Sequence, residues 1–492
     1  MRGGLLELAR GVALSLALAP AAALAQPAPP AQPPSPLPPP PEGFHVEPTV
    51  FWQGDGQRVD LSIASRVRTE DWSAFSNEGF SWYTGTRTRV RLGYSWRDEI
   101  LAVGEFQDVR LHGMDDDGTG ALATYRNANE GRSRVSGDDL RVMFLELRPF
   151  EKTFVRAGRQ EIKLDSQEVQ YAEPNWRYLR SARLGERLVG TVDWSHVGRT
   201  FDGLSAGGDA AGVRLFGFGA RPTQGVYEVE AAYRPLHDVF VGGATATVPR
   251  GAWLANDELG LFATYYDDQR SPAHGGLADG VSVTTIGAHW LGVHPCGPGN
   301  VDVLLWGAYQ TGQYDDLDHL AGAGILELGY QLPEVIAKPW IRVGLNVATG
   351  DGNPNDGDHH TFFNMLPTNH IYYGFADQLA FQNLWDSFVQ LRLAPHPMLA
   401  LNLFVHQLRL LDASDSRYAG TGAYDLTSFG FPATTSNGHR NVGTEYDVVA
   451  TFSPHKAVTI EAGFEWLDGG AVFQNQLDRD AQLGYVALEL EY

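Results

Sequence analysis

The sequence predicts an all-β fold, a transmembrane antiparallel β-barrel of about 18 strands. Three observations support this prediction. The chain begins with a secretory signal and has no later apolar run near the roughly 20 residues that a membrane-spanning helix needs. Apolar and polar residues alternate with period two over many segments. Short and long connections between these segments alternate along the chain.

The N-terminal region divides into a signal and a spacer. Residues 1–25 have basic residues at Arg2 and Arg10, an apolar run and an A-x-A cleavage site before Gln26. Residues 26–43 are rich in proline, which lacks an amide donor, so we expect an extended periplasmic spacer. Residues 44–492 are expected to form the barrel.

Composition excludes some classes of partner and of cross-link. The net charge is −22, and removal of the signal, which carries a net charge of +1, leaves −23. This acidity argues against nucleic acid as a partner. The single cysteine, Cys296, lies in the turn-like sequence HPCGPGN and excludes an internal disulfide framework.

Alternation assigns the two faces of each strand. In RTRVRLGYSW, Arg87, Arg89 and Arg91 fall on one face, whereas the apolar residues fall on the other. The last segment, GYVALELEY, alternates in the same way and ends in an aromatic residue, Tyr492, as final strands of outer-membrane barrels do. These strands have one wet face and one apolar face. The expected location is the bacterial outer membrane, with lipid as a partner.

The connections predict the topology. Short turns near 149, 295, 333, 396 and 455 interleave with long polar loops at 112–138, 165–197, 350–384 and 412–439. With both ends in the periplasm, all four long loops follow odd-numbered strands and are therefore extracellular. Residues 235–257 are too long for the turn expected there. The candidate strands start near 58, 84, 99, 139, 153, 199, 211, 224, 258, 280, 300, 320, 338, 385, 398, 440, 456 and 482.

The inward residues predict a charged lumen with a basic arc facing an acidic arc, a field that favours anionic solutes. The alternative is internal salt bridging that only stiffens the wall. The basic residues are Arg66, Arg68, Arg87, Arg89, Arg91, Arg159, Lys163, Arg342 and Arg392. The acidic residues are Glu228, Glu230, Glu327, Glu445, Asp447, Glu461 and Glu465.

Several short motifs appear in order along the chain. They are GRQE at 158–161, RLVG at 187–190, DW at 193–194, GRTFDG at 198–203 and TFFNMLPTNHIYYG at 361–374. With these motifs the chain resembles the alginate export family of outer-membrane barrels.

The resemblance implies passive export of an anionic polysaccharide such as alginate through an Arg-rich lumen that contains an inward-folded loop. It also implies periplasmic export components as partners. The lumen-lining residues that it implies are Arg159, Glu161, Arg187, Asp193, Arg199 and Asp202.

Two alternative functions remain open from the sequence. One is an uptake porin for small anionic solutes or oligosaccharides. The other is an outer-membrane hydrolase that uses Ser195 and His196, with Asp193 close by. Neighbours on an extended segment point to opposite sides, which places this pair poorly for catalysis. We therefore expect no enzyme and no catalytic residue.

No cofactor or metal is expected. DGNPNDGDHH, residues 351–360, superficially resembles a Ca²⁺ loop and gives Asp351 to Asp358 a weak case for binding Ca²⁺. However, Asp356 stands where an EF-hand needs glycine, and Phe362 where it needs glutamate. His359, His360 and His370 make a weak zinc set, and His370 is better explained as structural.

Overall fold

The strands of the chain close into one antiparallel barrel. The computed structural model describes residues 48–76, 79–230, 232–370, 372–419 and 433–492. The predicted signal peptide and proline-rich spacer lie outside these residues. Each barrel strand pairs with the next along the chain, and the last pairs with the first, so the predicted barrel of 18 strands is confirmed.

The barrel strands are β2 (Gln57–Ala74), β3 (Ser81–Trp96), β4 (Ile100–His112), β5 (Arg134–Leu147), β6 (Thr153–Gln160), β7 (Phe201–Ala210), β8 (Val213–Pro222), β9 (Val239–Val248), β10 (Asp257–Asp268), β11 (Val281–Cys296), β12 (Gly299–Tyr314), β13 (Leu317–Gln331), β14 (Trp340–Ala348), β16 (Leu384–His396), β17 (Leu399–Leu410), β20 (Asn441–His455), β21 (Val458–Gly469) and β22 (Ala481–Glu491).

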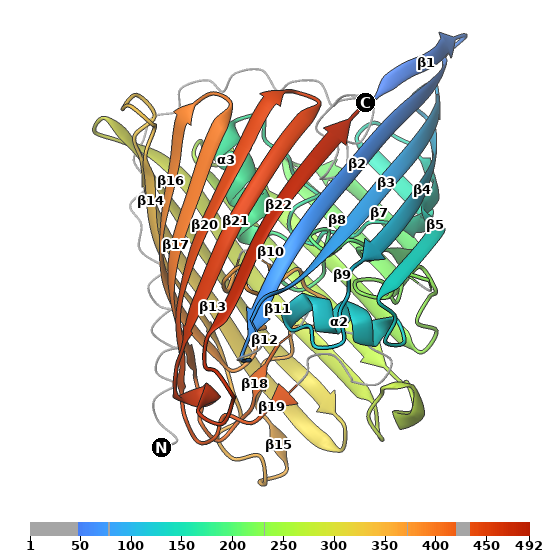
Figure 1. Ribbon diagram of the computed structural model, residues 1–492. Coiled ribbons are helices and arrows are strands. Elements are labelled where there is room, and N and C mark those ends of the chain that lie inside the picture. Colours follow the sequence, from blue (N-terminus) through green and yellow to red (C-terminus); the bar gives the residue numbers. More distant parts are fainter. Residues whose placement is uncertain (1–47, 77–78, 231, 371, 420–432) are drawn as a thin grey trace. The chain divides into compact units, whose positions relative to one another are not determined.

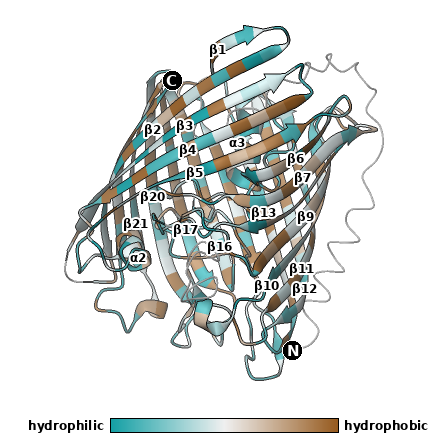
Figure 2. Cartoon of the chain, turned by 90° about the vertical axis from the view of Figure 1, so that its right-hand side faces the viewer, coloured by the Kyte–Doolittle hydropathy of each residue, from teal (hydrophilic) through white to brown (hydrophobic). Residues whose placement is uncertain are grey.

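Alternation sets the two faces of the wall, as Figure 2 shows in the exchange of hydrophobic and hydrophilic residues along the strands. In β3, Arg87 and Arg89 are buried on the inward face, whereas Leu92 is 53% exposed on the outward face. Closure of the sheet gives every barrel strand two neighbours, which is the way in which a sheet satisfies its backbone groups within lipid.

Short turns and long loops occupy opposite ends of the barrel. The C-terminal residue Tyr492 exchanges two backbone hydrogen bonds with Ile63 at the end of the barrel that carries the short turns. A further strand, β1 (Thr49–Gly54), extends β2 at this same end, and the long loops lie at the other (Figure 1).

The long loops contain α2 (Gly120–Ala128), α3 (Pro174–Leu179), a π-helix η1 (Arg180–Leu184), 3-10 turns η2 (Pro272–His274) and η3 (Ala471–Phe473), and the short strands β15 (Asp358–His359), β18 (Arg417–Tyr418) and β19 (Ala433–Thr434).

The prediction of a strand near 224 is wrong. Residues 223–238 form a loop, and the eighth barrel strand is β9, inside the segment 235–257 that the sequence left unresolved. VYEVEAAYR alternates because Tyr227, Val229 and Tyr233 pack into a core cluster between loops, not because it faces lipid on one side. Glu228 and Glu230 are therefore not lumen residues. Glu230 instead pairs with Arg132 at the loop surface.

The strands of the barrel wall are shorter on one side. β6 to β9 have 8 to 10 residues each, whereas β2 has 18 and β3 has 16. β5 pairs with β6 only over Met143 to Leu147, so its first half has a strand neighbour on one side only. Loop 223–238 lies against this half, because a side chain at Gly137 would collide with the carbonyl of Val229.

Candidate functional site: two loops inside the barrel

Two loops from different parts of the chain meet inside the barrel. Loop 161–200 follows β6, and loop 349–383 follows β14. Val189 and Leu366 form a parallel β-bridge, in which Gly190 N donates to Leu366 O at 2.9 Å and Leu366 N donates to Leu188 O at 3.0 Å. An isolated β-bridge thus joins the RLVG motif to Leu366, the residue before PTNH (residues 367–370), although the two segments are almost 180 residues apart in the sequence.

Apolar packing joins these loops to one side of the wall. Leu188, Val189, Phe363 and Leu366 belong to the same buried cluster as inward residues of β7 to β12, of which Trp306 is one. Close packing of this kind fixes a loop in one position. On this side the lumen is filled, not open.

A cluster of arginines holds the turn at residues 193–195, which we name the Asp193 turn. The Asp193 Oδ1 atom lies 2.6 Å from Arg89 Nη2, 3.3 Å from Arg87 Nη1 and 3.8 Å from Arg141 Nη2. Burial alone would raise the pKa of Asp193, but Arg87 and Arg89 outweigh it and hold this pKa well below its usual range. Asp193 is therefore a carboxylate at any physiological pH.

Two further arginines bind the backbone of the Asp193 turn. Arg66 Nη2 donates to Ser195 O at 2.7 Å and to Trp194 O at 3.0 Å. Arg68 Nη1 donates to Trp194 O at 2.8 Å. We call Arg66, Arg68, Arg87, Arg89 and Arg141 the basic arc. Its members come from β2, β3 and β5, and all are at least 94% buried.

Trp194 links the basic arc to the second loop. Its ring lies 3.8 Å from the Arg68 guanidinium and stacks on His370 with ring centroids 3.9 Å apart. His370 Nδ1 lies 2.9 Å from Asp377 Oδ2 in the same loop. The predicted structural role of His370 thus has a physical basis, since the DW and PTNH motifs stack on each other.

A second charged cluster fixes the middle of loop 161–200. Glu327 on β13 accepts hydrogen bonds from Arg183 at 2.8 and 3.0 Å, from Arg187 at 3.2 Å and from Arg342 on β14 at 2.6 Å. All four side chains are buried. Arg342 also pairs with Asp302. In this structure Arg187 and Arg342 bind the protein itself.

The predicted acidic residues on β20 and β21 lie near the basic arc, not opposite it. Glu445 and Asp447 on β20 and Glu465 on β21 are inward and buried, and Ala376 N of the second loop donates to Glu445 at 2.9 Å. Glu461 accepts from Tyr485 Oη at 3.0 Å. The expectation of opposed arcs is wrong for these residues, because closure leaves only β22 between β21 and β2, and only β21 and β22 between β20 and β2. Glu327 on β13 is separated from β2 by six strands and lies on the other side of the barrel.

Arg159 and Asp202 are not lumen residues in this structure. Arg159 Nε and Nη2 donate to Asp202 at 2.7 and 2.9 Å, and both residues lie in the row that contains the exposed, outward Met143. The inward residue here is Gln160, which is hydrogen-bonded to the inward Ser205. The sequence prediction placed this pair on the wrong face because charge was taken as a sign of the lumen.

The remaining predicted residues lie near the loops or the wall. Glu161 pairs with Arg141, and Arg91 lies 3.2 Å from Glu105. Lys163 and Arg199 are buried within loop 161–200. Arg392 on β16 lies 4.3 Å from the ring of Tyr178 and is only half-buried.

Ser195 and His196 do not form a nucleophile and base pair. Ser195 Oγ accepts from Gly198 N at 2.8 Å. The His196 imidazole packs between Tyr83 and Tyr125, with its Nε2 3.5 Å from Glu70. Burial, with Arg68 adding to it, lowers the pKa of His196 to about 3. Both residues hold the Asp193 turn in place.

Sequence reasoning missed Arg141, Arg180 and Arg183. A β-bulge between Glu105 and Phe106 breaks the alternation on the partner strand, so Arg141 and Val142 are both buried. Arg180 and Arg183 lie on the π-helix η1, and the spacing of Arg180, Arg183 and Arg187 is that of one helical face, a signal present in the sequence.

The acidic loop at 351–360 brings together one group of oxygen and nitrogen ligands. In the described part of the chain, side-chain atoms of Asp356, Asp358 and His360 lie within 4.8 Å of one another. Asp351, the first residue of the supposed Ca²⁺ loop, lies elsewhere and accepts from Asn353 N at 3.0 Å. Binding of Ca²⁺ here stays a prediction.

The closed wall, the inward loops and the polar lumen define an outer-membrane β-barrel channel. The sequence model for alginate export matches residues 58–485, so the chain belongs to the alginate export family. No curated protein matches the chain. No helix in the described residues is long and apolar enough to cross a membrane.

Solved structures with the same fold are outer-membrane proteins. The chain is 11% identical to OpdK from Pseudomonas aeruginosa, with a TM-score of 0.55 over 88% of this chain and 99% of that one. The chain is 10% identical to OccAB1 from Acinetobacter baumannii, with a TM-score of 0.57 over 88% of this chain and 96% of that one. It is also 10% identical to OccD3 (OpdP) from P. aeruginosa, with a TM-score of 0.55 over 91% of this chain and 95% of that one. At these identities the likeness shows the fold.

Proposed function

We propose that this channel carries an anionic polysaccharide such as alginate outward across the outer membrane by passive, charge-selective passage. One observation carries the proposal, namely that five buried arginines converge on the single carboxylate and the carbonyl oxygens of the Asp193 turn. Family membership gives alginate, a chain of uronates, as the first substrate to test.

The chemistry of the basic arc fits such a solute. Guanidinium groups bind carboxylates through paired, charge-assisted hydrogen bonds. In the closed arrangement Asp193 supplies the carboxylate, and once loop 161–200 withdraws, uronate carboxylates take its place. Arg392, with no acidic partner among the described residues, offers a further cationic group. Passage thus exchanges one set of carboxylates for another.

The test is conductance of the purified full chain in planar bilayers, with and without oligomers of mannuronate and guluronate. We expect preference for anions and a block by the oligouronates that neutral oligosaccharides of the same length do not cause. A cation-selective channel, or equal block by neutral oligomers, would contradict the proposal. Direction is tested by secretion of uronic acid from cells that lack their own exporter.

Uptake of small anionic solutes is the second candidate. One structure of OpdK, a protein with the same fold, contains vanillate, an aromatic carboxylate. The stacked rings of Trp194 and His370 beside Arg68 offer a comparable setting for such a molecule. Liposome swelling separates the two candidates. In an uptake porin, added oligouronates do not lower the rate at which vanillate enters the liposomes.

A further inference from the structure

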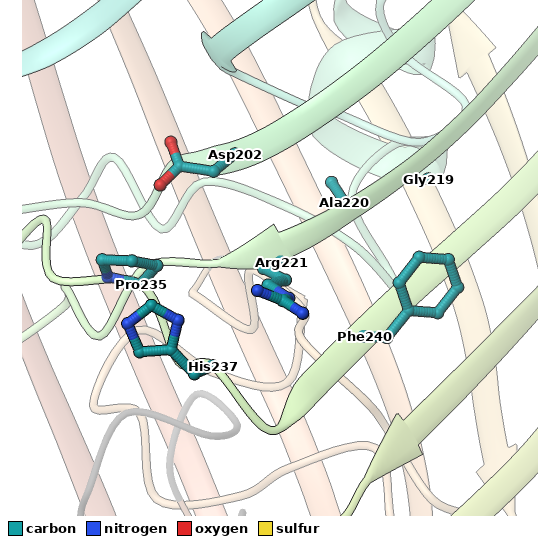
Figure 3. Close-up of a pocket in the computed structure, with 7 residues that line it drawn as sticks. All are labelled: Asp202, Gly219, Ala220, Arg221, Pro235, His237 and Phe240. Atoms are coloured by element: carbon teal, nitrogen blue, oxygen red, sulfur yellow. The ribbon is translucent and has the colours of Figure 1, made fainter.

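A pocket of about 470 Å³ opens on the outward face of β7, β8 and β9, where these strands approach the long loops. It is lined by Asp202, Gly219, Arg221, Pro235, His237 and Phe240. Figure 3 shows Arg221 between His237 and Phe240, with Asp202 on the neighbouring strand. The pocket faces away from the lumen, because Phe240 is 41% exposed and its neighbours Val239 and Val241 are buried inward.

The pocket carries the positive charge of Arg221, which no carboxylate among the described residues pairs with. Arg159 satisfies Asp202 with two hydrogen bonds, so this carboxylate is occupied. Within the described residues, the guanidinium of Arg221 and the imidazole of His237 have neither a hydrogen-bond partner nor an ion-pair partner. Two other charged residues of this loop end, Arg234 and Asp238, are exposed and opposite in sign.

On the short-turn side of this pocket the outward face carries a row of small residues, which we call the furrow. Ala206, Gly217 and Ala244 are cross-strand partners on the outward face. On β10 to β12 large side chains, such as Leu261, Ile286 and Tyr309, stand between the small residues of that face.

The furrow is not required by the packing of the barrel. A Cβ atom added at Gly217 would meet only Gly243 O, at 3.6 Å, and one at Gly219 would make ordinary contacts of 3.4 and 3.6 Å with Phe240. Since neither glycine has a positive φ, a larger residue would fit at both. The barrel alone therefore gives no reason for two glycines here.

We propose that the pocket and the furrow together bind a phosphorylated glycolipid of the outer leaflet, of the lipid A type. Its sugar phosphate lies against Arg221 and His237, and an acyl chain lies along the small residues. The row of Arg159, Asp202 and Arg221 is polar, whereas Leu204 below it is 60% exposed, so the pocket lies at the outer edge of the lipid-facing belt.

The geometry favours a lipid over a second copy of the chain. A protein partner would bury the Arg221 guanidinium, and burial of an unpaired charge is costly. The neighbouring carboxylate Asp202 cannot relieve this cost, since it is bound to Arg159. A lipid phosphate supplies the missing anion at the level where the headgroups lie.

The experiment is native mass spectrometry of the full barrel, delipidated in detergent and titrated with lipid A. We expect one retained lipid A per barrel and at least tenfold weaker retention in Arg221→Glu. Arg110→Glu is the matched control, because Arg110 is an outward, exposed arginine at the same end of β4. Heat-modifiable migration in gels confirms that each variant is folded.

A second variant tests the furrow. Gly217→Leu should weaken lipid A retention several-fold, whereas Gly307→Leu, on the outward face of β12, should not. Equal retention by wild type and Arg221→Glu would overturn the proposal. Binding of inorganic pyrophosphate as tight as that of lipid A would also overturn it. So would a Gly217→Leu variant that loses an oligomer but retains lipid A as the wild type does.

Discussion

The contact between Asp193 and the basic arc should control whether loop 161–200 closes the channel. Asp193→Asn removes the charge but keeps the volume of the side chain. Arg87 then keeps only the carbonyl oxygens of Asp193 and Ser195, whereas Arg89 keeps Gln107 and Arg141 keeps Glu105 and Glu161. Arg87 is then left with no carboxylate within ion-pair distance among the described residues, whereas Arg68 keeps Glu70 and Arg89 keeps Glu105 at 3.9 Å.

The size of the effect follows from burial. The arginines are at most 6% exposed and the Asp193 side chain is 17% exposed, so the pair is screened weakly by water. Breaking such a buried pair costs about 3–5 kcal/mol. Taking about 3 kcal/mol for the isosteric change, and roughly 1.4 kcal/mol per factor of ten, the released state gains about a hundredfold in population.

Single-channel recording in planar bilayers measures this gain as open probability. Asp108→Asn is the control, since Asp108 pairs with Arg110 on the outward face of β4 and an exposed pair of that kind contributes little to stability. If Asp193→Asn and Asp108→Asn both show wild-type open probability, and hydrogen exchange in loop 161–200 is unchanged, the proposed role of Asp193 in holding this loop closed is refuted.

A disulfide across the internal bridge should lock both loops. Val189→Cys with Leu366→Cys, in a Cys296→Ser background, joins two residues paired in the parallel bridge, and oxidation should abolish a conductance that reductant restores. Glu327→Gln should lower the free energy of unfolding by about 3–5 kcal/mol, because three buried arginines lose their common partner, whereas the exposed pair partner Glu173→Gln should cost about 1 kcal/mol or less. Thermal gel shifts measure both changes. His196→Phe should reduce the loss of stability in acid. Burial holds the pKa of His196 at about 3, so between this value and its ordinary value near 6.5 the unfolded chain binds the extra proton, and stability falls as pH falls. A melting temperature with the same pH slope in both proteins over this range would contradict the assignment.

The wall could be predicted from the sequence because lipid and lumen impose opposite demands on alternate residues. Seventeen of the eighteen strands expected from alternation and turn spacing correspond to strands of the barrel, and in β3 the two faces divide as RTRVRLGYSW indicates. The exception near 224 shows the limit of this reasoning. An extended loop that packs between other loops has two distinct sides as well, so its sequence also alternates.

The interior was harder to predict because charge alone does not fix a face. Arg159 and Asp202 lie at the outer edge of the wall, where a charged pair can face outward beside polar headgroups. The inward arginines were found, but not what they bind. That depends on contacts between residues more than 100 positions apart, such as Arg87 and Asp193, which period-two alternation does not encode.

Salt bridging within the wall and binding of an anionic solute were alternatives in the sequence, yet the structure makes them compatible. The basic arc bonds mainly to a loop, not to neighbouring strands, and that loop is tied to a second loop through Val189, Leu366 and the stacked Trp194 and His370. If loop 161–200 withdraws, as the proposed function requires, the same arginines become free to bind a solute. If the oxidised cross-link closes the channel and Asp193→Asn opens it, the same arginines serve as latch when closed and as solute site when open. If the cross-link leaves conductance unchanged, passage follows another route and the arginines only brace the wall.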